Sequence, residues 1–155
     1  MRDSGIIAAC FRTGRGQLMR NFQTLDHAVV DATTGVITFT LQASDGLHPT
    51  IALRREGEYA PISASYGALE IALRLRLREL VRTLSHLQPN DGLNTTRQVG
   101  TGDCFLGMGL RTDGSLVLRP TIIGDASGYF CLNLILAPEA ATALRDWLGG
   151  DSANV

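Results

Sequence analysis

The stretch ASYGALEIALRLRLRELVRTLSHL, residues 64–87, decides the fold because it could form either a strand or a helix. Its central part, LRLRLREL, alternates apolar and charged residues as a half-buried strand does. Its length and its lack of strong breakers favour a helix, which PNDG (89–92) would end. Glu70 and Arg74 would then form an ion pair at i, i+4. The apolar stripe would comprise Leu73, Leu77, Leu80, Val81, Leu84 and Leu87, and a second stripe Arg74, Arg78 and Arg82.

The segments on both sides of this stretch indicate strands separated by tight turns. Strands are expected at 5–12, 35–42, 49–55, 103–110, 114–122 and 128–136, with shorter ones at 28–31 and 94–100. ATTG (32–35), ASDG (43–46), RTDG (111–114) and DASG (125–128) each end in the glycine that hairpin turns favour. A second helix is expected at 137–148, before Gly149 and Gly150.

This order, strands and then a helix, occurs twice. We therefore expect an α+β fold of two antiparallel, roughly four-stranded sheets, each followed by a helix. Residues 1–150 would form one domain of two similar halves, 1–88 and 93–150, because the join between them is too short for a linker. Residues 151–155 would be a short flexible tail.

The composition indicates a globular chain whose net charge is too small to give a strong electrostatic field. The 155 residues carry a net charge of −1, and all 14 basic residues are arginine. Arginine recognises phosphate with a planar, bidentate fork wherever it clusters. The apolar run 128–138 is too short to span a bilayer, and GIIAAC (5–10) is too short for a signal peptide, so we expect a cytoplasmic protein without a membrane partner.

No motif for catalysis or metal binding is evident. Cys10, Cys104 and Cys131 lie far apart, and the three histidines are isolated from them, so no metal or cofactor is expected. TGRGQL (13–18) lacks the lysine and the Ser/Thr of a phosphate-binding P-loop. Asp103, Asp113 and Asp125 lie in or beside turns, where aspartate is favoured for its hydrogen bonds to the backbone. We expect a protein that is not an enzyme.

The segment CFRTGRGQLMRNF, residues 10–22, is the strongest candidate site. Arg12, Arg15 and Arg20 could contact phosphates, and Phe11 and Phe22 could stack on bases. The alternative is a solvated hairpin loop whose Phe11 belongs to the core. Elsewhere, Arg119 could extend a basic sheet surface and Tyr129 could stack at a strand end, whereas the Arg74/Arg78/Arg82 stripe is typical of a solvated helix face.

Two stretches make the chain resemble the Whirly family of single-stranded DNA-binding proteins. The family motif Lys-Gly-Lys-Ala-Ala-Leu follows an aromatic near the end of the first strand, and Gly14, Arg15 and Leu18 match it in type after Phe11. The late hairpin DASGYFCLNL (125–134) is similar to the family's Asp-Gly-Ser-Gly, aromatics and Asn-Leu. The resemblance implies binding of single-stranded DNA across sheet edges and assembly into homo-oligomers, usually tetramers.

The expected function is sequence-tolerant binding of single-stranded DNA or RNA by a homo-oligomer. The alternative is a scaffold or assembly factor that uses the same fold to bind protein. The predicted nucleic-acid-binding residues are Phe11, Arg12, Arg15, Gln17, Arg20, Phe22, Arg119 and Tyr129.

Overall fold

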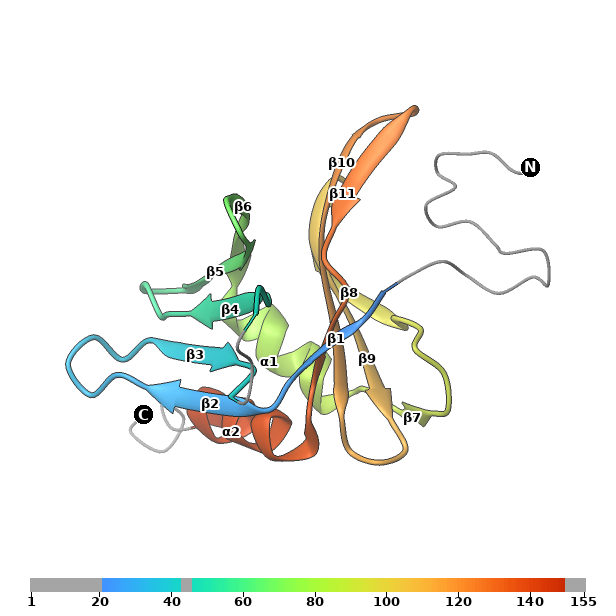
Figure 1. Cartoon of the computed structure of the whole chain (residues 1–155). Coiled ribbons are helices and arrows are strands. Elements are labelled where there is room, and N and C mark those ends of the chain that lie inside the picture. Colours follow the sequence, from blue (N-terminus) through green and yellow to red (C-terminus); the bar gives the residue numbers. More distant parts are fainter. Residues whose placement is uncertain (1–20, 43–45, 150–155) are drawn as a thin grey trace.

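The computed structural model describes residues 21–42 and 46–149, which form two sheets and two helices (Figure 1). The expected α+β class is confirmed. One sheet has five antiparallel strands in the order β2-β3-β4-β5-β6, so that each strand pairs with its neighbour in the chain. Its strands are β2 (His27–Val30), β3 (Ile37–Thr40), β4 (Thr50–Leu53), β5 (Tyr59–Tyr66) and β6 (Leu69–Arg76).

The second sheet has seven strands and is centred on the long β9–β10 pair. The path is β1-β12-β10-β9-β7, with β11 added beside β10 and β8 beside β9. The pairs β1–β12 and β7–β9 are parallel, and the others are antiparallel. Its strands are β1 (Gln23–Leu25), β7 (Pro89–Asn90), β8 (Arg97–Gly100), β9 (Cys104–Arg111), β10 (Leu116–Asp125), β11 (Gly128–Cys131) and β12 (Leu134–Leu136).

The sheet sizes correct the expectation of two four-stranded sheets. Two strands that were not predicted, β5 and β6, lengthen the first sheet, and β1 leaves the first half of the chain to pair with β12. The predicted strand 128–136 is divided into β11 and β12. The expected strand 5–12 and the tail 151–155 lie outside the described residues.

The stretch 64–87 is not one helix, and that prediction was wrong. β5 runs to Tyr66, Gly67 makes a turn with φ of 63°, and β6 returns along β5. Alternation then places Ile71, Leu73 and Leu75 in the core and leaves the residues between them exposed. The helix, α1 (Leu77–Ser85), begins only where this alternation ends.

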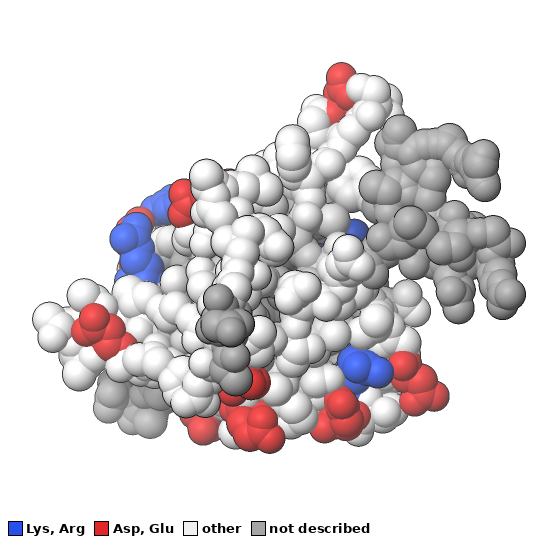
Figure 2. Space-filling model, viewed as in Figure 1, with Lys and Arg blue, Asp and Glu red and all other residues white. Residues whose placement is uncertain are grey.

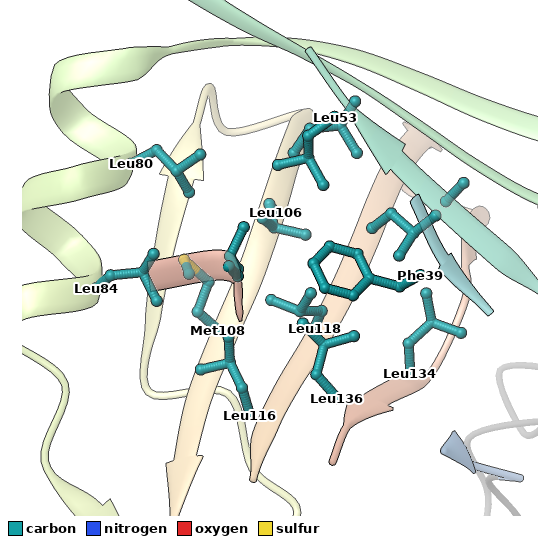
Figure 3. Packing of buried hydrophobic residues seen from close by; sticks show 14 of the residues in the cluster. Phe39, Leu53, Leu80, Leu84, Leu106, Met108, Leu116, Leu118, Leu134 and Leu136 are labelled. Atoms are coloured by element: carbon teal, nitrogen blue, oxygen red, sulfur yellow. The ribbon is translucent and has the colours of Figure 1, made fainter. Parts of the chain in front are cut away.

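One hydrophobic cluster draws from both sheets and both helices. Figure 3 shows Phe39 of β3 among the leucines of the seven-stranded sheet, with Leu80 and Leu84 of α1 beside them. The second helix, α2 (Pro138–Gly149), agrees with its predicted range and buries Ala140, Ala141, Leu144 and Leu148. Figure 1 shows both helices at the end of the sheets opposite the β5–β6 and β10–β11 hairpins.

Aspartates secure three of the turns. The Asp31 carboxylate accepts the backbone N–H groups of Thr33 and Thr34. Asp113 accepts the hydroxyl and N–H of Ser115, and Asp125 accepts those of Ser127. These hydrogen bonds stabilise the ionised form and hold the pKa of each of the three carboxyls below its ordinary value. The turn role expected for Asp113 and Asp125 is confirmed.

Candidate nucleic-acid interface

Most of the predicted site lies outside the described residues. Those members are Phe11, Arg12, Arg15, Gln17 and Arg20. Their role stays a prediction.

The three remaining predicted residues belong to the seven-stranded sheet or directly precede it: Arg119 is on β10, Tyr129 on β11, and Phe22 comes just before β1. Arg119 and Tyr129 share a face, because Ile123 is opposite Tyr129 and alternate residues of β10 point the same way. The Arg119 guanidinium donates from Nε to Asn133 Oδ1 at 2.8 Å and from Nη2 to Cys131 Sγ at 3.3 Å. Phe22 is half-buried and directly precedes Gln23, whose N–H bonds the Asn133 carbonyl. Arg119 is therefore anchored across β11.

The predicted arginine stripe is divided between two elements. Arg74 is on β6, whereas Arg78 and Arg82 are on α1, so these side chains do not share one helix face. The predicted Glu70–Arg74 ion pair is also wrong, because i and i+4 lie far apart along a strand. Arg74 instead pairs with Glu56 at 3.5 Å, and Glu70 accepts a hydrogen bond from Ser63 Oγ.

A cluster of charged side chains occupies the end of the five-stranded sheet near Tyr59. The Arg74 guanidinium lies 3.7 Å from the centre of the Tyr59 ring, and Arg76 lies at 5.7 Å. Glu56 bridges Arg54 at 2.7 Å and Arg74 at 3.5 Å. Figure 2 shows basic side chains, with acidic ones among them, on the side where β4 and β5 lie. Because Glu56 offsets its charge, this cluster is a weaker anion site than the arginine count suggests.

Three hollows lie along the two helices, and we call them together the helix groove. The first, of about 720 Å³, is lined by Val30, Thr34, Gly35, Arg55, Ala143, Asp146 and Trp147. The second, of about 750 Å³, is lined by Arg55, Glu58, Arg76, Leu77, Arg78, Glu79, Val81, Arg82, Ser85 and Leu148. The third, of about 380 Å³, is lined by Arg82, Thr83, His86, Arg97 and Gln98. Arg55 lines both the first and the second hollow, and Arg82 lines both the second and the third.

The helix groove is basic although the chain is slightly acidic. Five arginines line it, against three acidic residues (Glu58, Glu79 and Asp146). Arg76 is paired with Glu79 at 3.7 Å. Within the described part of the chain, the guanidinium groups of Arg78, Arg82 and Arg97 make no ion pair or hydrogen bond. These three charges are therefore available to an anionic ligand.

An aromatic side chain lies at one end of the helix groove. The Arg55 guanidinium lies 4.5 Å from the centre of the Trp147 ring and also donates to the Trp147 carbonyl. The indole Nε1 donates to the Gly35 carbonyl at 2.9 Å, which ties α2 to the turn between β2 and β3. Arg55 thus brings a cation against an aromatic face beside the unpaired arginines.

Sequence reasoning missed this groove because its residues come from separate elements. Arg55 follows β4, Arg97 is on β8 and Trp147 is near the end of α2. The available signal was the density of arginine between residues 54 and 97.

Comparison with known proteins adds no relative. No family model, curated protein or solved structure matches this chain. In the described residues, neither helix is long and apolar enough to cross a membrane. The same residues contain no group of three or more metal-ligating side chains.

Proposed function

We propose that this protein binds single-stranded nucleic acid, largely without sequence preference, through the helix groove. The observation that supports this most directly is that Arg78, Arg82 and Arg97, whose guanidinium groups have no partner among the described residues, line two hollows that share Arg82. Arginine binds phosphate oxygens in a bidentate fork, and such contacts supply affinity without reading the bases.

The surroundings of these arginines favour a single strand over a duplex. Arg78 and Arg82 are four residues apart on α1, a rise of about 6 Å, and so can follow neighbouring phosphates along an extended backbone. Val30 and Val81 are 52% and 40% exposed and, with Trp147, give unpaired bases an apolar surface. Cations that track the backbone beside apolar and aromatic surface are typical of sequence-tolerant single-strand sites.

The residues predicted from the sequence would extend this contact. Arg12, Arg15 and Arg20 would add phosphate contacts, with Gln17 as a further polar contact, and Phe11 and Phe22 would add stacking. Arg119 and Tyr129 would contact the strand at the edge of the seven-stranded sheet. We also propose that the protein acts in the cytoplasm as a homo-oligomer and is not an enzyme.

Fluorescence anisotropy with a labelled oligonucleotide of 20 nucleotides, titrated at several salt concentrations, tests the proposal. We expect binding that weakens steeply with salt and differs little between oligonucleotides of different sequence. In the variant Arg78→Gln/Arg82→Gln, the slope of log affinity against log salt should fall by about 1.4, because each lost phosphate contact on a single strand contributes about 0.7. No binding at micromolar protein in low salt would overturn the proposal.

Two matched variants locate the site. Arg145→Gln removes an exposed arginine of α2 that does not line the groove, and it should leave the salt slope unchanged. The triple variant Arg12→Gln/Arg15→Gln/Arg20→Gln tests the N-terminal arginines. If only the triple variant lowers the slope, nucleic acid binds at residues 10–22 and the helix groove is not the site.

The second candidate, a protein-binding scaffold, has its own supporting observation. Large apolar side chains are exposed near the ends of the two projecting hairpins, including Phe130 at 63% and Leu69 at 46%. A protein that ignores oligonucleotides at low salt but co-purifies with a stable protein partner would favour this function.

A further inference from the structure

Among the described residues, the outer edge of β11 has no partner strand. Its other edge pairs with β10. The Leu132 N–H bonds the Pro120 carbonyl, so the even-numbered residues of this segment direct their backbone groups toward β10. The N–H and C=O groups of Tyr129 and Cys131 therefore point away from the sheet. Figure 1 shows this hairpin projecting from the body of the molecule.

Within the part of the chain that the structure describes, the edge carries none of the usual protections against pairing. Exposed edges are normally blunted by charged residues, proline or a covering element. The segment 126–134, ASGYFCLNL, contains neither a charged residue nor proline. β1 covers only the lower part of the same edge, beginning where the Gln23 N–H bonds the Asn133 carbonyl at 3.1 Å.

Phe130 makes this edge apolar as well as open. Phe130 lies opposite Ile122, which packs against the core, so Phe130 is on the core-facing side of the sheet. It is nevertheless 63% exposed, because the hairpin extends past the core. The apolar face of the sheet thus continues onto the hairpin, where no described residue covers Phe130.

We propose that two copies of this chain pair antiparallel along β11 and join their seven-stranded sheets. The direction of the backbone groups restricts the register to pairs of odd-numbered residues, and we take the one that pairs both outward residues of β11 with each other. Tyr129 and Cys131 carry the outward groups, so Tyr129 of each copy lies opposite Cys131 of the other and the two residues exchange hydrogen bonds. The twofold axis then passes between the two Phe130 residues. An antiparallel arrangement about a twofold axis gives both copies the same contacts, which closes the assembly at this edge.

The two faces of the joined strands are complementary in this register. On one face the two Phe130 side chains are directly opposite, with Cβ atoms about 4.5–5.5 Å apart. On the other face, Tyr129 of the second copy lies beside Cys131, whose Sγ is 3.3 Å from the Arg119 guanidinium. The cation of Arg119 thus lies next to the electron-rich face of an aromatic ring. No like charges meet, because the paired segments are uncharged.

The inference does not depend on nucleic-acid binding, and its test contains no nucleic acid. Light scattering after size exclusion should give twice the chain mass of 16.6 kDa, or an even multiple of it. Phe130→Glu places two like charges on the axis and should raise the dissociation constant at least tenfold or halve the mass. Leu47→Glu, at a residue 66% exposed against 63% for Phe130, is the matched control and should leave the mass unchanged.

A cross-link tests the register itself. In a chain whose three cysteines are replaced by serine, Phe130→Cys should form a disulfide-linked dimer under mild oxidation, because only the residue on the axis faces its own copy. Ser127→Cys, in the exposed turn, should link far more slowly. A monomeric protein at about 100 μM, a mass unaffected by Phe130→Glu, or equal linking at both positions would each overturn the proposal.

Discussion

At the scale of single residues, the close approach of another backbone segment explains why β9 contains two glycines. Leu106 and Met108 face the core, whereas Gly107 and Gly109 face the other way. A Cβ atom added to Gly109 would overlap the Asn94 carbonyl oxygen, and one added to Gly107 would lie 3.2 Å from the Thr95 side chain. The backbone before β8 therefore crosses the outer face of β9 at a distance that only glycine permits.

Gly109→Ala should lower the free energy of unfolding by about 1–3 kcal/mol, since the backbone of Asn94 must move to make room. Gly107→Ala should cost clearly less, because its Cβ would lie 3.2 Å from Thr95 and would not overlap a backbone atom. Urea unfolding of both variants and the parent checks this. Equal stability of the two variants would mean that the segment around Asn94 shifts without cost.

At the scale of elements, the join of β6 and α1 shows how two periodicities coexist in one stretch. LEIALRLR alternates and forms β6, and LRELVRTLS has helical spacing and forms α1. The change occurs at Leu77, whose N–H bonds the Glu58 carbonyl at 2.8 Å, immediately before β5. Alternation correctly predicts β6, and helical spacing correctly predicts α1. The error was to extend the helical spacing back over β6.

On α1, Leu80 is fully buried and its neighbour Val81 is 40% exposed. Leu80→Ala should lower the free energy of unfolding by about 2–5 kcal/mol, because it leaves a cavity between α1 and the sheets. Val81→Ala should change it by less than about 0.5 kcal/mol. Chemical denaturation of both variants tests which side of α1 faces the core. Comparable losses of unfolding free energy at the two positions would contradict this orientation of the helix.

At the scale of the whole molecule, the two sheets share one hydrophobic core. The cluster contains Phe39 and Ile51 from the five-stranded sheet, Leu106 and Leu118 from the seven-stranded sheet, and Leu84 from α1. β1 strengthens the connection, because it lies just before β2 in the chain yet belongs to the other sheet. Separation of the two sheets would therefore expose the apolar face of each sheet to water.

We therefore expect a single cooperative unfolding transition. Fluorescence of the only tryptophan, Trp147 on α2, and far-UV circular dichroism of the strands should give coincident urea curves. The reason is that both probes depend on the same buried cluster. Two separate transitions would instead show that the halves 1–88 and 93–150 fold independently.

The sequence alone determined the elements that local chemistry fixes. Gly35 and Gly114, with φ of 76° and 91°, made two hairpin turns predictable, and strict alternation identified β3. β5 was missed because its last three residues were assigned to the helix predicted for 64–87, and it also contains Pro61, a residue that argues against an interior strand. Pro61 lies where β4 ends, and its carbonyl accepts the Arg54 N–H, so the missing donor disrupts little of the ladder.

Tertiary structure decided which sheet each strand joined and which charges met. β1 pairs with a strand more than a hundred residues away, and no local pattern specifies that partner. Arg55, Arg78, Arg82 and Arg97 line one groove only because β6 turns into α1 beside the end of α2. Periodicity and turn residues act only between close neighbours in the chain. Burial of a shared apolar core decides which distant strands pair. That pairing also brought the arginines of the helix groove together.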